Sequence, residues 1–474
     1  MESFIGRRSE LAVLEKQYER KSGFVVLYGR RRVGKTTLIK EFIKGKPALY
    51  FLASREAEAL NIRRFAGDMA DFVGQPALKE GNYTDWRPLF KAFADHEASE
   101  RKVLVIDELP YLVKGNPAFP SVLQYAWDEL LRDANVMLVI CGSSVHMMRD
   151  VALSHDSPLY GRRTAQIRLK PMRFSEMASG FPEYGFSDLV DLFALTGGVP
   201  KYFEFFEPID RFEECVKENV FSTSGFLYEE PRFLLDEDIR DPMNYLSILR
   251  AVSAGNRRQS DIAGMLGKKT GVMSPYLKTL AGLGFIERRV PFTEKYPERS
   301  KSGLYYICDT FVDFWFRYVQ PFTGELEMGN MRPSLEAVGR TFQSNFVPFV
   351  FETVSRQAFA DLCAAGQIDF APSRIGSYWN RRGSVEIDVG AVDNSSGRCF
   401  FGECKYRERE PVSMGDFEVL RVKAESVPGP FDAPPLFGLF SRTGFSKELR
   451  AHAALRSVSI DERLYDHRSN ELSG

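Results

Sequence analysis

The stretch GRRRVGKTT (29–37) constrains this chain more than any other part of it. It follows the apolar run GFVVLYG (23–29), which is typical of a buried parallel strand, and it leads into TLIKEFIKG (37–45), which has helical character. A strand, a loop of the form G-x-x-x-x-G-K-[ST] and a helix, in this order, are the context in which backbone N–H groups and a helix N-terminus surround phosphate oxygens. We therefore expect an α/β fold with a phosphate-binding loop after its first strand.

The residues of this loop have distinct expected roles. The two glycines allow tight turns, Lys35 is expected to reach the β- and γ-phosphates of a nucleotide, and the Thr36 hydroxyl is expected to ligand Mg²⁺. The three arginines are expected to be largely solvated, although their charge favours an anionic partner. A glycine-rich turn with a chance lysine is the alternative, and it does not account for the full pattern. The predicted nucleotide contacts are Gly29, Arg30, Arg31, Arg32, Val33, Gly34, Lys35, Thr36 and Thr37.

A second apolar run, VLVIDELPYL (103–112), carries two carboxylates at the end of a predicted strand. Asp107 fits a ligand of Mg²⁺, and Glu108 fits a base that orients or deprotonates the attacking water. Standing alone, the pair would be better explained as an acidic helix cap. Together with the loop at 29–37, it favours the catalytic interpretation.

Two further segments supply polar groups after strand-like runs. NVMLVICGSS ends in Ser143 and Ser144, which suit either contact with the γ-phosphate or attacking water, or the N-cap of a following helix. SPLYGRRTAQIRL contains Arg162 and Arg163, either of which could neutralise charge in the transition state or be an ordinary surface arginine. Such an arginine acts in its own chain or on a neighbouring copy, and the second case would make the protein a homo-oligomer.

These segments together resemble the archaeal-type P-loop ATPases, relatives of the AAA+ and STAND groups. The resemblance rests on the order and spacing of FIGRRSEL, GRRRVGKTT, VLVIDELPYL, VICGSS, PLYGR and LTGGVPKY. It implies that ATP and Mg²⁺ are the ligands. It also implies that the neighbourhood of Phe4–Arg7 lies near the adenine, and that Gly197, Gly198 and Pro200 belong to a segment that closes a helical lid.

The middle of the chain contains a helix-turn-helix pattern. NYLSILRAVSAG (244–255), RRQSDIAGMLG (257–267) and KTGVMSPYLKTLAGLG (269–284) predict three short helices, and a strand, a tip over 291–303 and a returning strand follow. This order suits a winged helix that contacts DNA phosphates. Winged helices also serve as protein–protein modules or ATPase lids, and the basic residues are then merely solvated. Those residues are Lys268, Lys269, Lys278, Arg288, Arg289, Lys295, Arg299 and Lys301.

Near the carboxyl end, the run SVEIDVGAV, the turn DNSSG and the run RCFFGECKY predict a β-hairpin over 384–406. Because side chains at positions i and i+2 share a face of a strand, the hairpin is expected to bring Asp388 together with Glu403 and Lys405. Two carboxylates make an oxygen-rich site for Mg²⁺, and the lysine would stabilise charge on a phosphate. The alternative is an amphipathic hairpin with a cross-strand pair of an acid and a lysine.

This hairpin resembles the core of the PD-(D/E)xK nucleases, whose fold is restriction-endonuclease-like. The resemblance implies Asp388, Glu403 and Lys405 as catalytic residues and adds an acidic metal ligand from the preceding helix, a role that Glu352 fits. Trp379 matches a tryptophan before the acidic strand in the domain that is fused to archaeal-type ATPases. No proline precedes Asp388, so the literal "PD" is absent. Members that only bind DNA keep the same fold, so cleavage stays open.

These segments predict an α/β protein in which a parallel P-loop NTPase sheet carries a helical lid, followed by a winged helix and a C-terminal restriction-endonuclease-like α/β domain. A chain of 474 residues is too long for one hydrophobic core. The expected domains are an ATPase core over 1–180, a lid over 181–240, a winged helix-turn-helix over 241–320 and a nuclease-like domain over 330–474.

Composition and charge limit the classes of partner that we expect for this protein. The net charge of −1 means that any nucleic-acid surface is a local patch. The six cysteines lack zinc-site spacing and are expected to be reduced thiols. The sequence shows neither a signal-peptide core nor an apolar run of membrane length, so we expect a cytoplasmic protein with no membrane partner.

Three functions stay open at this point. The first is nucleotide-gated DNA processing, in which ATP hydrolysis controls DNA binding and cleavage by the carboxyl-terminal part. The second is a slow signalling switch that retains ADP and whose C-terminal domain binds a partner protein, or DNA without cleavage. The third is a DNA-binding regulator whose catalytic residues are incidental.

Overall fold

The structure is a computed structural model, and it describes residues 4–207, 211–239, 241–429, 431, 433–451 and 459–460. The chain forms two compact units. The first unit comprises residues 1–172, 199–201 and 236–240, and the second comprises residues 173–198, 202–235 and 241–474. The four-domain division expected from the sequence stays a prediction.

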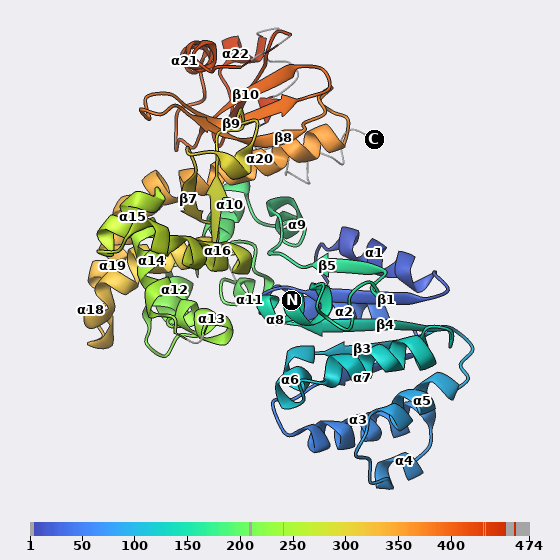
Figure 1. Cartoon of the computed structure of the whole chain (residues 1–474). Coiled ribbons are helices and arrows are strands. Elements are labelled where there is room, and N and C mark those ends of the chain that lie inside the picture. The colour runs from blue at the N-terminus through green and yellow to red at the C-terminus, as the bar shows by residue number, and fades with distance from the viewer. Residues whose placement is uncertain are drawn as a thin grey trace. The chain divides into compact units, whose positions relative to one another are not determined.

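The first unit is built around a five-stranded parallel sheet with the order β2-β3-β4-β1-β5 (Figure 1). The strands are β1 (Gly23–Tyr28), β2 (Ala48–Leu52), β3 (Lys102–Asp107), β4 (Val136–Gly142) and β5 (Ala165–Arg168). Every residue of β1, β3 and β4 is buried, which explains why these strands are continuous apolar runs. The parallel sheet predicted from the sequence is confirmed, and it brings the carboxyl ends of β1, β3 and β4 to one edge.

Helices cover both faces of this sheet. On one face, Leu27 of β1 shares a core cluster with Leu14 of α1 and Leu38 of α2. Another cluster is aromatic, with the ring of Phe51 in β2 packed 5.1 Å from that of Phe65 in α3. The helices of this unit are α1 (Arg8–Tyr18), α2 (Lys35–Ile43), α3 (Glu58–Val73), α4 (Ala77–Glu80), α5 (Arg87–Asp95), α6 (Leu109–Gly115), α7 (Phe119–Tyr125), η1 (Ala126–Leu131), α8 (Val145–Met148) and η2 (Arg149–Leu153).

The second unit begins with a helical region. Three helices and an antiparallel strand pair, β6 (Ile286–Arg289) with β7 (Leu304–Ile307), occupy the segment where the winged helix is expected. The helices up to this pair are α9 (Phe174–Ala178), α10 (Phe186–Thr196), α11 (Pro200–Phe203), α12 (Phe212–Val216), η4 (Lys217–Phe221), α13 (Glu230–Asp238), α14 (Met243–Ser253), α15 (Gln259–Met265), η5 (Thr270–Val272) and α16 (Met273–Leu283). Helices α11 and α13 each contribute residues to both units.

A mixed five-stranded sheet with the order β12-β11-β10-β9-β8 forms the carboxyl-terminal part of the second unit. Strands β8 to β10 are antiparallel, whereas β11 and β12 run parallel to β10. The strands are β8 (Arg374–Trp379), β9 (Glu386–Asp393), β10 (Arg398–Lys405), β11 (Leu436–Ser441) and β12 (Ser459–Ile460). The predicted hairpin is therefore confirmed as β9 and β10.

Helices pack on both faces of this second sheet. Phe400 of β10 stacks on Phe359 of α20 with ring centroids 4.0 Å apart, and Phe401 shares a cluster with Phe417 and Leu420 of α21. The remaining helices are η6 (Pro297–Arg299), α17 (Thr310–Tyr318), η7 (Gln320–Phe322), α18 (Thr323–Glu327), α19 (Arg332–Thr341), η8 (Phe342–Phe346), α20 (Val347–Ala364), α21 (Met414–Glu425) and α22 (Lys447–Ala451). In the described part of the chain, no helix combines the length and the apolar character that a membrane span needs.

The segment expected as a wing tip, 291–303, is anchored to this sheet at its start. Phe292 is buried with Tyr378 and Phe401, and its carbonyl oxygen accepts a hydrogen bond of 3.1 Å from Arg374. A Cβ on Gly390 would lie 2.2 Å from the Phe292 ring, so this approach requires glycine. The start of the predicted wing is thus part of a hydrophobic core rather than a free surface.

A buried carboxylate on α10 predicts how the stability of the second unit depends on pH. Burial raises the pKa of Asp191 to about 6, although the Gln343 amide, Arg442 and the Tyr406 hydroxyl partly oppose that rise. Because the ordinary pKa of an aspartate is about 4, the folded protein retains this proton between about pH 4 and pH 6 while the unfolded chain releases it. Ionisation of Asp191 therefore lowers the free energy of unfolding as pH rises through that window.

We expect the free energy of unfolding of the wild type, relative to Asp191→Asn, to fall as pH rises from about 4 to about 6 and then to level off. The asparagine can still accept the hydrogen bond that Gln343 donates over 2.7 Å, so packing is largely preserved. Urea unfolding of both proteins at a series of pH values measures this difference. A difference that is constant with pH would contradict the assignment.

Candidate functional site

The glycine-rich loop lies between β1 and α2 and has a backbone that only glycine accommodates at two positions. A Cβ on Gly29 would lie 2.2 Å from the Leu169 carbonyl oxygen. Gly34 has φ of 90° and directly precedes α2, which begins at Lys35. The two glycines of the motif thus permit the close approach and the left-handed turn that bring the loop to the start of the helix.

Lys35 lies over this loop. Its ammonium group is buried and donates hydrogen bonds of 2.8 Å to the carbonyl oxygens of Gly29 and Arg30. These carbonyl groups hold the charge at the position where the motif is expected to receive a phosphate chain. The lysine can exchange them for phosphate oxygens, because both kinds of oxygen accept the same hydrogen bonds.

Two segments that are distant in sequence contact the 29–37 loop. The buried guanidinium group of Arg7 donates to the Val33 carbonyl oxygen over 2.9 Å and to the Lys170 carbonyl oxygen over 2.7 Å. Pro200 lies 3.7 Å from the position that a Cβ on Gly34 would take. The stretches FIGRRSEL and LTGGVPKY, which are part of the family resemblance, therefore both contact the loop, the second also through a Lys201 N–H that donates to the Arg32 carbonyl oxygen.

A hydroxyl and a carboxylate meet beside the loop in an arrangement that suits a hard cation. Thr36 Oγ1 donates to Asp107 Oδ2 over 3.0 Å, and Asp107 is almost completely buried. Tyr50 of β2 donates to the same oxygen over 2.6 Å, and the Glu108 backbone N–H donates to Asp107 Oδ1 over 2.9 Å. Burial and the bond to Asp107 raise the pKa of Tyr50, so the phenol remains a donor. The donor set fits Mg²⁺, which prefers oxygen ligands.

Glu108 and the two serines lie together at the ends of β3 and β4. Glu108 has φ of 57°, and its Oε2 accepts hydrogen bonds from the Ser143 backbone N–H over 3.2 Å and from Ser143 Oγ over 3.1 Å. Ser144 instead caps α8, because its Oγ accepts from the Met147 N–H. The N-cap alternative thus holds for Ser144, and contact of Ser143 with a γ-phosphate or an attacking water stays a prediction.

Sequence reasoning missed an acidic contact at this edge. Glu237, near the end of α13, accepts a hydrogen bond from Ser143 Oγ over 3.0 Å and forms an ion pair of 2.6 Å with Arg31 of the loop. Asp238 accepts from Ser144 Oγ over 2.7 Å. Burial raises the pKa of Glu237, and Arg31 opposes that rise. The acidic stretch LLDEDIRD contains these residues, but nothing in the sequence indicated where it folds.

Arg162 has a structural partner. Its Nε and Nη2 donate to Asp128 Oδ2 over 2.9 and 2.7 Å, and its Nη1 donates to the Pro158 carbonyl oxygen over 2.7 Å. The guanidinium group of Arg163 lies 5.7 Å from the centre of the Tyr160 ring. The structure thus places Arg162 in an ion pair with η1, and its predicted contact with a nucleotide stays a prediction.

The hairpin residues form a second cluster, in the second unit. Glu403 Oε1 accepts hydrogen bonds from Lys405 over 2.9 Å and from Lys423 of α21 over 2.7 Å. Asp388 Oδ2 accepts from the Cys404 backbone N–H over 2.8 Å. Glu403 Oε2 is buried and has no hydrogen-bond partner among the described residues. The expected grouping of Asp388, Glu403 and Lys405 is present, and Lys423 is an addition that no sequence signal marked.

Buried acidic and basic groups lie side by side in this cluster. Glu352 lies on α20, where Arg356 contacts its Oε2 over 3.4 Å and donates to the Asp388 carbonyl oxygen over 2.9 Å. Burial, with the charges of Glu352 and Glu403, raises the pKa of Asp388 to about 7. Burial also raises the pKa of Glu352, and Arg356 and Arg289 oppose that rise. A cation next to Asp388 would oppose this rise in its pKa.

The described residues nevertheless contain no group of three or more His, Cys, Asp and Glu side chains arranged to hold a metal ion. A cation at the hairpin would have as its carboxylate ligands Asp388 and the unpartnered oxygen of Glu403, and these oxygens are of the type that Mg²⁺ prefers. The proposed metal ligands stay predictions at both clusters: Thr36, Asp107, Glu352, Asp388 and Glu403.

Comparisons with known proteins identify two parts of the chain. Residues 4–206 match the model of an ATPase domain predominantly from Archaea, and residues 315–417 match a model described as "Archaea bacterial proteins of unknown function". An uncharacterized protein of Methanocaldococcus jannaschii, MJECL04, is 32% identical over 411 residues, which cover 85% of this chain and 88% of that protein.

Two further similarities are shorter or more distant. A protein of the same organism, named as an uncharacterized ATP-binding protein, is 52% identical over 44 residues, which are 9% of this chain and 75% of that protein. A Walker-type ATPase of Pyrococcus abyssi is 22% identical with a TM-score of 0.53, over 66% of this chain and 96% of that chain. The last similarity shows a shared fold.

Proposed function

The chain belongs to the archaeal P-loop ATPase family, and from that premise we propose that it hydrolyses ATP at the 29–37 loop and transmits the nucleotide state through α13. ATP binding and an ATPase domain are properties of the family. The proposal adds the roles of individual residues and the route of coupling. It is carried by one observation: Ser143 Oγ contacts both Glu108 and Glu237.

The loop and its neighbours supply the charge that hydrolysis requires. Lys35 exchanges the carbonyl groups of Gly29 and Arg30 for the oxygens of the β- and γ-phosphates. Thr36 and Asp107 hold Mg²⁺, which when bound neutralises charge on the phosphates. The contacts that Ser143 makes with Glu108 go to Oε2, which leaves Oε1 of that carboxylate to orient the attacking water.

Coupling follows from competition between two anions. Without a nucleotide, the Glu237 carboxylate accepts the contacts of Ser143 Oγ and Arg31, both of which are donors suited to a γ-phosphate. A bound γ-phosphate competes with Glu237 for these donors and repels its charge. Helix α13 begins at Glu230, which is counted with the second unit, and its last residues are counted with the first. Displacement of Glu237 therefore moves a helix that is continuous with the second unit.

The hairpin cluster favours a second activity, metal-dependent cleavage of phosphodiester bonds. Its support is the combination of an unpartnered Glu403 oxygen, an Asp388 carboxyl whose pKa is raised to about 7, and an adjacent Lys405 ammonium group. A cation would satisfy the two carboxylates, and Lys405 would stabilise charge on the scissile phosphate. DNA is the proposed substrate, and binding of DNA or a partner protein without cleavage is the alternative.

Substitutions of Lys35 and Glu108 are expected to impair ATP hydrolysis in different ways. Lys35→Ala removes the charge that grips the phosphates and should weaken ATP binding by at least about tenfold. Glu108→Gln preserves the shape of the site but cannot take a proton, so ATP should still bind while turnover falls by about 100-fold or more. Calorimetry and phosphate-release assays measure the two quantities. Wild-type turnover in Glu108→Gln would exclude Glu108 as the base.

Glu237→Gln tests the coupling. Removing the competing charge should tighten ATP binding by about three- to tenfold while ADP binding changes little, because ADP has no γ-phosphate. Asp236→Asn is the matched control, since this exposed neighbour loses the same charge on the same helix. Calorimetric titration of each protein with a slowly hydrolysed ATP analogue and with ADP gives the ratio of affinities. The same ratio in all three proteins would rule out the competition.

Plasmid nicking with Mn²⁺, with and without ATP, tests the second activity. We expect the wild type to nick DNA, Lys405→Ala to be slower by about 100-fold, and nucleotide to change the rate. Lys447→Ala removes the same charge from an exposed position of the same unit and should nick as the wild type does. Equal nicking by Lys405→Ala, or no nicking by any protein, counts against cleavage at this site while leaving ATP hydrolysis intact.

A further inference from the structure

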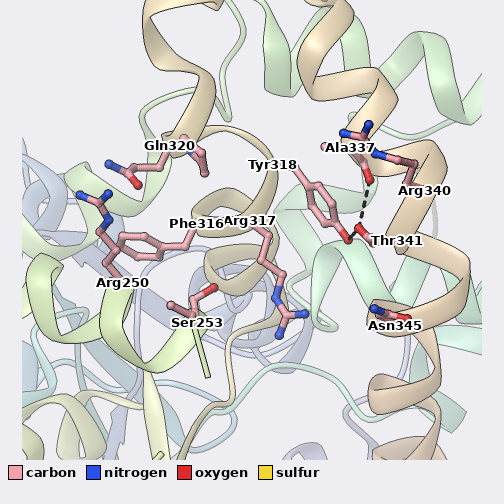
Figure 2. Close-up of a pocket in the computed structure, with 12 residues that line it drawn as sticks. Arg250, Ser253, Phe316, Arg317, Tyr318, Gln320, Ala337, Arg340, Thr341 and Asn345 are labelled. Atoms are coloured by element: carbon pink, nitrogen blue, oxygen red, sulfur yellow. Dashed lines mark hydrogen bonds between the residues drawn. The ribbon is translucent and has the colours of Figure 1, made fainter. Parts of the chain in front are cut away.

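The second unit contains a cavity of about 410 Å³ that neither proposed site uses (Figure 2). Residues of α14, α17 and α19 line it, and its volume lies within the range of about 300–1,000 Å³ that small-molecule sites occupy. Most of the lining residues lie within 315–417, the part of the chain that matches a domain of unknown function.

Three arginines from three helices surround this cavity. Figure 2 shows Arg250 of α14 beside Gln320 on one side, Arg340 of α19 on the other side, and Arg317 of α17 between them. Arg317 forms an ion pair of 2.8 Å with Asp313. Arg250 and Arg340 are exposed, and within the described ranges neither guanidinium group has an acidic partner. The cavity therefore carries more positive than negative charge.

The central arginine is held in place. Asp313 binds its guanidinium group, and the Phe346 ring centre lies 5.3 Å from it. Its Nε is buried and finds no acceptor among the residues that the structure describes. The side chain remains partly exposed, so its guanidinium group can still receive an anion from the cavity. The guanidinium group is also preorganised, because both contacts exist without the ligand.

The rest of the lining suits an organic group rather than a bare ion. Phe316 and Pro321 supply apolar surface, and the side-chain amides of Gln320 and Asn345 can donate and accept hydrogen bonds. A hydrogen bond of 2.9 Å between the Tyr318 hydroxyl and Thr341 Oγ1 joins α17 to α19 beside the cavity (Figure 2).

We propose that this cavity binds a small organic phosphate of nucleotide size, whose phosphate is neutralised by Arg250, Arg317 and Arg340. Guanidinium groups match phosphate geometry and remain charged at all relevant pH values. Phe316 and Pro321 contact the organic part, and the two amides pair with its polar atoms. A phosphate in a nucleic-acid strand presents the same chemistry, so the test separates a free nucleotide from a strand. The site does not depend on the 29–37 loop.

The experiment uses the full chain with Lys35→Ala, so that binding at the loop does not contribute. Cytidine monophosphate and a 5′-phosphorylated single strand of about ten nucleotides are each titrated by calorimetry. Adding Arg250→Gln and Arg340→Gln together should weaken binding by at least about tenfold. The matched control adds Arg132→Gln and Arg421→Gln, which remove the same charge from two half-exposed positions outside the cavity. Thermal unfolding confirms that each variant is folded.

Each outcome decides the proposal. A free ligand is supported if the mononucleotide binds, the two cavity substitutions weaken that binding, and the two control substitutions do not. Binding of only the strand, lost in the same way, supports a strand phosphate at the same arginines. The proposal is overturned if neither probe binds, or if the control pair weakens binding as much as the cavity pair does.

Discussion

The buried contact between Thr36 and Asp107 is the constraint on which the first site depends. It joins the start of α2 to the end of β3, although β4 separates β3 from β1 in the sheet. A buried carboxylate is costly unless hydrogen bonds satisfy it, and Asp107 has three: from Thr36, from Tyr50 and from the Glu108 backbone. These bonds fix the position of Glu108 as well, because its backbone N–H is one of the three donors. The loop, the metal position and the proposed base thus share one arrangement of strand ends.

Ser143 extends that arrangement to the last residues of α13. One hydroxyl contacts both the Glu108 and the Glu237 carboxylates, and two negative groups at a single hydroxyl repel each other. Arg31 offsets this repulsion, because it forms an ion pair with Glu237 and is itself held by a hydrogen bond of 2.8 Å to the Tyr111 hydroxyl. In the function that we propose, a phosphate group would alter this balance of charges at the end of α13. Ser143 Oγ would then take part in both hydrolysis and coupling, because it contacts the proposed base as well as Glu237.

The sequence was sufficient where chemistry follows from short-range order. The loop, the carboxylates after β3, the serines after β4 and the shared face of Glu403 and Lys405 all depend on neighbours within a few residues and on the fact that strand ends meet at one edge. It was insufficient where a partner comes from packing between distant segments. Tyr50, Glu237, Lys423 and the buried Phe292 are ordinary residues in ordinary stretches, and only the tertiary fold brings them to their sites. Arg162 shows the same limit, since a loop arginine has many reachable carboxylates and Asp128 is its partner.

The two carboxylate clusters differ in how completely their charges are satisfied, and that difference supports different chemistry. At the first, hydrogen bonds reach both oxygens of Asp107. At the second, two lysines contact one oxygen of Glu403, while its other oxygen is buried without a partner and burial raises the pKa of Asp388 to about 7. A hairpin that served stability alone would gain from neutral or fully paired groups at these positions, because unpaired buried charge destabilises a fold. In the nuclease that we propose, a cation would pair with Asp388 and with the buried oxygen of Glu403, next to the Lys405 ammonium group that contacts the other oxygen of Glu403.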